Sequence, residues 1–162
     1  MIIALASDHA GYAQLKDLQV FLERAGHTCL YFGPHRFNPT DDYPDYIFPA
    51  AQSVASGKSQ AGIIIGGDGE GEAMAANRLK GVRCAVFYGP AVAKAPVDAE
   101  GDISHDPFEV IKLTRLHNNA NMLSLGARFL TLKDMQNAVK LWLDTDFSKA
   151  ERHQRRIEKL DT

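Results

Sequence analysis

A glycine-rich turn near the middle of the chain has residue types that can bind an anion. It reads Gly66-Gly67-Asp68-Gly69-Glu70-Gly71 and follows three consecutive isoleucines. Backbone N–H groups of such a turn can converge on a negative charge at the amino end of the following helix. The spacing is neither the dinucleotide pattern G-x-G-x-x-G nor a P-loop, since no Lys-Ser or Lys-Thr pair closes it, so nucleotide hydrolysis is not predicted. The glycines are equally compatible with a tight turn that has only a structural role.

A carboxylate and an imidazole, Asp8 and His9, follow the first apolar run of the chain. Such side chains can bind a metal ion, but neither a His-Glu-x-x-His nor a paired-cysteine spacing is present, so we predict no metal. A phosphoacceptor receiver domain also has acids at this place. Asp68 could serve as its acceptor, but Gly126-Ala127-Arg128 lacks the lysine that such a domain needs after its fifth strand, so this class is disfavoured.

The carboxy-terminal tail contains a pair of arginines, Arg152 and Arg156, which are four residues apart and share one face of a helix. Two converging guanidinium groups suit a phosphate, because arginine forms bidentate hydrogen bonds to phosphate oxygens. The alternative is a solvated face on which Glu151 and Glu158 form exposed ion pairs. Further back, His117 ends a predicted helix just before the fifth apolar run, at a helix–strand junction.

Short apolar runs alternate with helical periodicity five times, and these elements must position the polar side chains. Strands are predicted at 2–6, 28–32, 61–65, 82–87 and 121–125, and helices at 15–25, 45–57, 72–80, 107–119 and 132–144. This alternation predicts an α/β fold, a Rossmann-like three-layer α/β/α arrangement with a five-stranded parallel sheet. Such sheets bind ligands at the carboxyl ends of their strands, so we expect the site in the loops after strands one, three, four and five.

Composition limits the class of protein. With 162 residues, 18 basic and 20 acidic side chains and a net charge of −2, the chain is predicted to be one domain, residues 1–162. A loop insertion is expected near 88–105 and a basic tail at 147–162. The charge argues against a nucleic-acid partner. No apolar run is long enough for a membrane span, and two cysteines in apolar runs favour a reducing cytoplasm.

Five ordered blocks resemble the ribose-5-phosphate isomerase B family, which includes the galactose-6-phosphate isomerase subunits. They cover nearly the whole chain and read Ser7-Asp8-His9-Ala10-Gly11, Asp42-Tyr43-Pro44, the glycine turn continued to Arg78, Arg115 to Asn121, and Arg152 to Ile157. The resemblance implies a three-layer fold and a homodimer or homotetramer with a shared active site. It also implies a reaction without metal or organic cofactor, in which a sugar phosphate is ring-opened and isomerised through a cis-enediolate.

The resemblance also implies roles for individual residues. Glu72 matches the glutamate base of one branch of the family, whereas another branch has a cysteine at the position of Gly66. His117 matches the ring-opening acid and Asn118 a partner of a substrate hydroxyl. The remaining substrate-binding residues are Asp8, His9 and Tyr43 at the sugar and phosphate, the turn residues Gly67, Asp68, Gly69 and Gly71 at the enediolate oxygens, and Arg128, Arg152 and Arg156 at the phosphate.

Two features depart from the family pattern. Asp68 stands where the family has Ser or Thr, and an ionised carboxylate there would repel an enediolate unless it turns outward or the substrate differs. The segment near 88–105 is longer than in compact members. We therefore expect an aldose–ketose isomerase acting on a pentose, hexose or tetrose phosphate. The alternative is a non-catalytic sugar-phosphate binding or sensor subunit.

Overall fold

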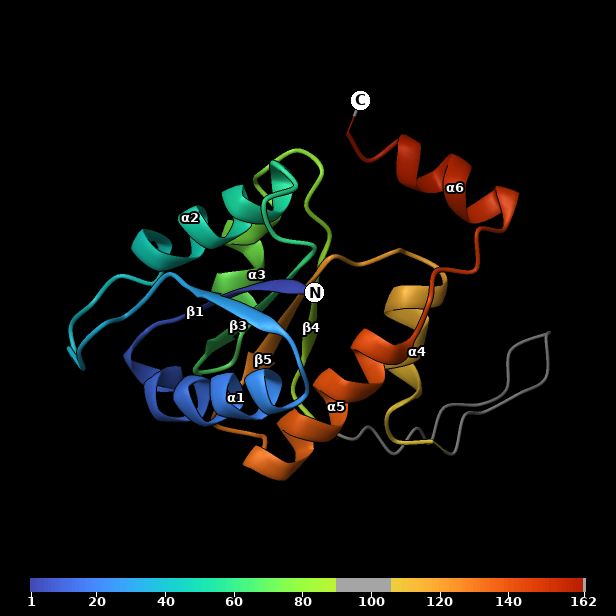
Figure 1. Cartoon of the computed structure of the whole chain (residues 1–162). Coiled ribbons are helices and arrows are strands. Elements are labelled where there is room, and N and C mark those ends of the chain that lie inside the picture. Colours follow the sequence, from blue (N-terminus) through green and yellow to red (C-terminus); the bar gives the residue numbers. More distant parts are fainter. Residues whose placement is uncertain (90–105, 162) are drawn as a thin grey trace.

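A five-stranded parallel sheet forms the centre of the computed structural model, which describes residues 1–89 and 106–161 (Figure 1). The strands are β1 (Ile2–Ser7), β2 (Thr28–Tyr31), β3 (Ala61–Gly66), β4 (Cys84–Phe87) and β5 (Met122–Gly126). Their order is β2-β1-β3-β5-β4, and each neighbouring pair is parallel. The predicted α/β class with five parallel strands is confirmed. The insertion expected near 88–105 lies outside the described residues, apart from its first two.

Helices cover both faces of this sheet (Figure 1). Side chains of α1 (Tyr12–Arg24), α4 (Glu109–Leu116) and α5 (Leu132–Asp144) form one core cluster with the sheet, and those of α2 (Pro44–Ala55) and α3 (Glu70–Ala76) form the other. A short 3-10 helix, η1 (His9–Gly11), links β1 to α1. The last helix, α6 (Glu151–Glu158), lies outside the two helical layers.

The central strand β3 is buried on both faces, as its three isoleucines predict. Ile63, Ile64 and Ile65 are each 0% exposed, and alternate residues point into the two opposite core clusters. Full burial of one such side chain contributes about 1.5–3 kcal/mol of hydrophobic stabilisation. Because β3 lies between β1 and β5, it fixes the positions of the loops that follow all three strands.

Four helices begin at other residues than the sequence pattern predicts: α1 starts at Tyr12 instead of Leu15, α2 at Pro44 instead of Asp45, and the other two are α3 and α4. The helix expected at 72–80 is α3, which ends at Ala76. It starts at Glu70, because Gly69 adopts a left-handed conformation (φ 84°) immediately before it. The helix expected to begin at Pro107 starts two residues later, at Glu109. There, Asp106 accepts a hydrogen bond from the N–H of Phe108 (2.9 Å) and so forms a turn that precedes the helix.

The tail packs beside the end of α4 rather than against the sheet. The N–H of Ser148 donates to the carbonyl of Leu116 (3.2 Å), and the N–H of Gly81 donates to the Asp161 carboxylate (3.0 Å). These contacts join both ends of the tail to the body of the domain. In the described ranges, no helix is both long and apolar enough to cross a membrane.

Candidate active site

The loops after β1, β3 and β5 meet at the carboxyl edge of the sheet and surround an open cavity of about 300 Å³. Most of the substrate-binding residues predicted from the sequence lie here, together with the predicted base. The lining comprises Asp8, His9, Ala10, Tyr43, Gly67, Asp68, Glu70, Gly71, Glu72 and Arg128. Ala10 and Glu70 are the two lining residues that the sequence analysis did not single out.

Glu72 is a buried carboxylate in the wall of this cavity, with 4% of the residue exposed. Its carboxyl group packs against the backbone of Gly66: an added Cβ at Gly66 would lie 2.0 Å from Glu72 Cδ. Burial raises the pKa of Glu72, and the negative charges of Asp8 and Asp68 add to the rise. Its own backbone N–H and His9 act in the opposite direction. Burial is the largest of these effects, so Glu72 is a stronger base than an ordinary glutamate.

One N–H group of the glycine turn is engaged within the protein, and Gly67, Asp68, Gly69 and Gly71 stay the predicted partners of an enediolate. The N–H of Glu70 donates to Asp68 Oδ1 (3.0 Å). Asp68 is exposed and lines the cavity, so its carboxylate both caps the turn and contributes negative charge at the rim.

Two glycines allow larger side chains to approach the turn closely. An added Cβ at Gly67 would lie 3.2 Å from Nε of Arg128, so the guanidinium group lies directly over this peptide. An added Cβ at Gly71 would lie 3.0 Å from Cζ of Tyr43. Arg128 is fixed further by its backbone N–H, which donates to the carbonyl of Gly67 (3.0 Å). These contacts bring a cation and a phenol to the same cavity as Glu72.

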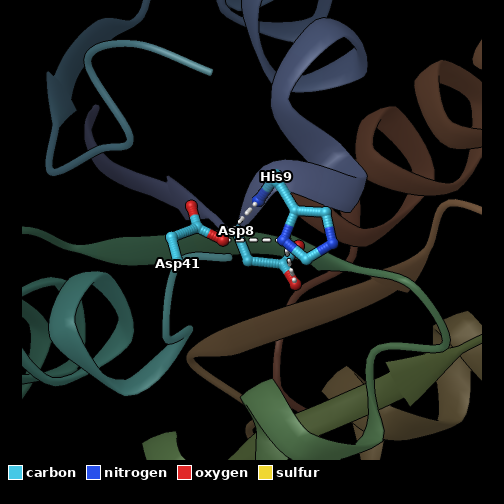
Figure 2. A group of neighbouring side chains, drawn as sticks. All are labelled: Asp8, His9 and Asp41. Carbon is cyan, nitrogen blue, oxygen red and sulfur yellow. Dashed lines mark hydrogen bonds and ion pairs between the residues drawn. The ribbon is translucent and has the colours of Figure 1, made fainter. Parts of the chain in front are cut away.

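A carboxylate that the sequence analysis missed lies beside His9 (Figure 2). Asp41 Oδ1 is 2.7 Å from His9 Nδ1 and accepts a hydrogen bond from the His9 backbone N–H at 3.2 Å. Asp8 Oδ2 lies 3.7 Å from the same ring nitrogen. Asp41 is 32 residues from His9 in the sequence and lies in a polar loop. The one signal in the sequence that could have indicated it is its position directly before the motif Asp42-Tyr43-Pro44.

The same three side chains are the group in the described residues best arranged to hold a metal ion, because their ligand atoms lie within 4.8 Å of one another. The distances instead match a hydrogen-bonded acid–histidine pair. Nδ1 of His9, the ring nitrogen nearest both carboxylates, is occupied by its contact with Asp41. Oδ1 of Asp41 is thereby paired, whereas Oδ2 of Asp41 is buried without a hydrogen-bond partner among the described residues.

A second cavity, of about 260 Å³, contains the other predicted catalytic residue. It is lined by His117, Asn118, His153, Arg156, Ile157 and Leu160. His117 is the C-cap of α4, and its ring centroid lies 4.4 Å from that of His153. Its position before β5 puts it at the amino edge of the sheet, whereas Glu72 lies at the carboxyl edge.

His153 is a buried residue in the lining of this second cavity, and it contacts Ser148 and Arg152. Its Nδ1 lies 3.0 Å from the Ser148 hydroxyl, and Arg152 Nε donates to its Nε2 at 3.2 Å. Burial lowers the pKa of His153, and the neighbouring His117 and Arg152 lower it further. The neutral ring therefore accepts a hydrogen bond from Arg152. This bond holds Arg152, a predicted phosphate ligand, beside the neighbouring rings of His117 and His153.

Thiol chemistry is not favoured at either cavity. Cys29 and Cys84 are both free and half-buried. Burial raises the pKa of Cys29 to about 11 and also raises that of Cys84, where the charge of Glu72 adds to the effect. Both sulfurs are thus protonated at neutral pH and are weak nucleophiles.

Comparison with known proteins identifies the family. A model of the ribose/galactose isomerase family matches residues 3–100 and 103–160. The chain belongs to the ribose/galactose isomerase family. It is therefore an enzyme of the aldose–ketose isomerase class, as the five sequence blocks predict.

Individual relatives agree with this assignment over almost their whole lengths. Ribose-5-phosphate isomerase B of Mycolicibacterium paratuberculosis is 34% identical over 158 residues, which cover 98% of this chain and 88% of the relative. The putative sugar phosphate isomerase YwlF of Bacillus subtilis is 34% identical, with coverage of 99% and 95%.

Solved structures show the same fold. Ribose-5-phosphate isomerase B of Clostridium thermocellum superposes with a TM-score of 0.84 at 33% identity, covering 99% of this chain and 95% of that one. The Mycoplasma genitalium enzyme with bound ribulose-5-phosphate has a TM-score of 0.83 at 34% identity, with coverage of 98% and 93%. The described part of the chain therefore has the fold of these two ribose-5-phosphate isomerases B.

Proposed function

We propose that this isomerase interconverts ribose 5-phosphate and ribulose 5-phosphate, or a closely related aldose and ketose phosphate, through a cis-enediolate and without a metal or organic cofactor. The observation that carries the proposal is the buried Glu72 carboxylate, whose pKa is raised and which lines one cavity with the glycine turn and Arg128. The relative with bound ribulose-5-phosphate supports the choice of substrate.

Glu72 is the proposed base. Its carboxylate removes the proton from C2 of the open-chain aldose, and the C–H electrons form the enediolate while the carbonyl oxygen at C1 becomes negative. A proton then passes from the C2 hydroxyl to the C1 oxygen, and return of the carbon-bound proton to C1 forms the C2 carbonyl of the ketose. No electrons enter or leave the site. A base whose pKa lies nearer to neutral pH transfers protons more effectively at that pH.

The enediolate oxygens are bound by N–H groups of the glycine turn, Gly67, Gly69 and Gly71 being the proposed donors. Loss of one donor of this kind costs about 3 kcal/mol of transition-state stabilisation. Arg128 binds the phosphate, and Asp8 and His9 contact the sugar. The cavity thus supplies a base, anion donors and a cationic side chain, but no ring-opening acid.

The missing acid is supplied, in this proposal, by a second copy of the chain. His117 and Glu72 line separate cavities that share no lining residue, so one chain does not place both groups around one sugar. A homodimer or homotetramer brings His117, Asn118, Arg152 and Arg156 of one copy to the glycine turn of another. His117 then protonates the ring oxygen, and the arginines complete the phosphate site.

A second candidate function is that of a non-catalytic sugar-phosphate binding subunit. It is favoured by one observation: the exposed Asp68 carboxylate at the rim of the cavity opposes a developing negative charge. Its hydrogen bond to the N–H of Glu70 disperses part of that charge, which makes the site more tolerant of an enediolate than an unpartnered aspartate would be.

An isomerisation assay over pentose, hexose and tetrose phosphates distinguishes the two functions. We expect turnover on at least one member of the panel, lowered about a hundredfold or more in Glu72→Gln, as is typical for loss of a general base. Glu23→Gln, which changes an exposed carboxylate on α1, is the matched control. Tight binding without turnover on every member would instead establish the binding subunit.

A further inference from the structure

Asp41 and His9 form a close acid–histidine pair beside the cavity, with 2.7 Å between Oδ1 and Nδ1, and the proposed function gives Asp41 no role. The Asp41 side chain is 3% exposed, and that of His9 is 34% exposed. A carboxylate this buried loses much of its hydration, so its hydrogen bonds to protein groups replace the water that it gives up. Two hydrogen bonds from His9 end on its Oδ1 atom.

The two contacts hold different parts of His9. The bond from the backbone N–H fixes the start of η1, and the contact with Nδ1 fixes the rotation of the ring. Because a carboxylate only accepts hydrogen bonds, Nδ1 must carry the proton in this pair. Figure 2 shows the second ring nitrogen on the side of the ring away from Asp41.

We propose that Asp41 is a positioning residue that holds the His9 imidazole in its Nδ1–H tautomer and in one orientation, with Nε2 presented to the cavity. The kinetic part of this proposal rests on the proposed isomerase function. Nε2, which carries no proton in this tautomer, is then the ring atom that faces the substrate and accepts a hydrogen bond from a sugar hydroxyl. Asp41 itself does not line the cavity and acts through His9.

Packing on the far side of Asp41 keeps the carboxylate in place. Burial raises the pKa of Tyr46, with the negative charge of Asp41 and a hydrogen bond to it adding to the rise. Tyr46 in turn packs on Gly33, where an added Cβ would lie 2.5 Å from Cδ1 of the ring. Asp41 thus lies between a fixed phenol and the His9 ring, which leaves it little freedom to move.

The direct test is the tautomer of His9, which nitrogen NMR of ¹⁵N-histidine-labelled protein reports without any substrate. His9→Gln assigns the signal. At a pH where the ring is neutral, we expect the His9 proton on Nδ1, and a change to Nε2–H, the form that free histidine prefers, in Asp41→Leu. Asp41→Asn keeps an oxygen acceptor and should retain Nδ1–H. The proposal is overturned if wild-type His9 carries its proton on Nε2, a result that needs no variant to fold.

Kinetics supply the second readout. Asp41→Leu should raise KM for the sugar phosphate about tenfold, the effect of one hydrogen bond to the substrate, while kcat stays within about threefold. Asp41→Asn should recover most of the loss, and Asp45→Asn, which changes an exposed acid in the first turn of α2, should leave KM unchanged.

A double variant tests whether Asp41 acts through His9. In a His9→Gln background, Asp41→Leu should add nothing further; fully additive losses would mean that Asp41 acts independently of His9. If the wild type isomerises no substrate, the proposed function fails, whereas the NMR result still decides the role of Asp41.

Discussion

The carboxyl group of Glu72 occupies the space that a side chain on Gly66 would need. An ideal Cβ at Gly66 would lie 2.0 Å from Cδ and 2.0 Å from Oε2 of Glu72, far inside van der Waals contact. Gly66 is the last residue of β3, and Glu72 is the third residue of α3. A side chain at position 66 and the Glu72 side chain would thus compete for one volume.

Gly66→Cys should therefore disable the enzyme even though it adds a potential nucleophile. We expect a destabilisation of about 1–3 kcal/mol, the usual cost of overpacking, and at least a tenfold loss of kcat, because Glu72 must move. Adding Glu72→Ala should restore most of the stability, which thermal unfolding measures. If Gly66→Cys costs the same stability with and without the Glu72 side chain, the two residues do not compete for space.

Glu72 should also lower the stability of the folded protein at neutral pH. Its folded pKa is raised, mainly by burial, so the folded state holds this proton more tightly than the unfolded state does. The resulting stabilisation is present at low pH and is lost as the pH rises through the folded pKa. Glu72→Gln should therefore have a higher Tm than the wild type at pH 7 and a smaller advantage at pH 4. An equal Tm difference at both values would contradict the raised pKa.

Asp68→Ser should shift the pH dependence of catalysis. The charge of Asp68 is one of the causes that raise the pKa of Glu72, after burial and Asp8. A serine hydroxyl can still accept from the N–H of Glu70, so the turn is retained while the charge is removed. We expect the acidic limb of the kcat/KM profile to move to lower pH and turnover on ribose 5-phosphate to rise. An unchanged profile would show that the Asp68 charge does not reach Glu72.

Mixed oligomers test the shared site. Chains with Glu72→Gln and chains with His117→Asn should each be inactive alone. In randomly mixed dimers, half would be heterodimers with one intact site each, so about a quarter of the wild-type activity should return. Recovery of no activity, although both variants assemble, would place both catalytic residues in one chain.

Elements governed by local patterns were predictable from the sequence. The isoleucines of β3 indicate a buried strand, and Thr131 and Asp134 form the capping box of α5 that their spacing predicts. The start of α3 was not predictable from the sequence pattern, because the left-handed conformation of Gly69 and the hydrogen bond from the N–H of Glu70 to Asp68 decide where that helix begins. The family blocks contain most of the residues that line both cavities, and the roles of these residues in catalysis stay predictions.

The contacts that the sequence did not reveal join residues far apart in the chain. Asp41 lies in a polar loop whose composition indicates solvent, yet its carboxylate is buried against His9. His153 lies in a charged tail and is buried as well, against His117. In both cases burial depends on how a loop or helix returns to the domain, which periodicity does not encode.

The proton transfer by Glu72 is tested most directly by NMR of ribose 5-phosphate incubated with the enzyme in D₂O. The wild type should produce ribulose 5-phosphate that carries solvent deuterium at C1, and Glu72→Gln should form it at least about a hundredfold more slowly. Conversion by Glu72→Gln at the wild-type rate, or ribose 5-phosphate that binds to the wild type and stays unchanged, would contradict the account.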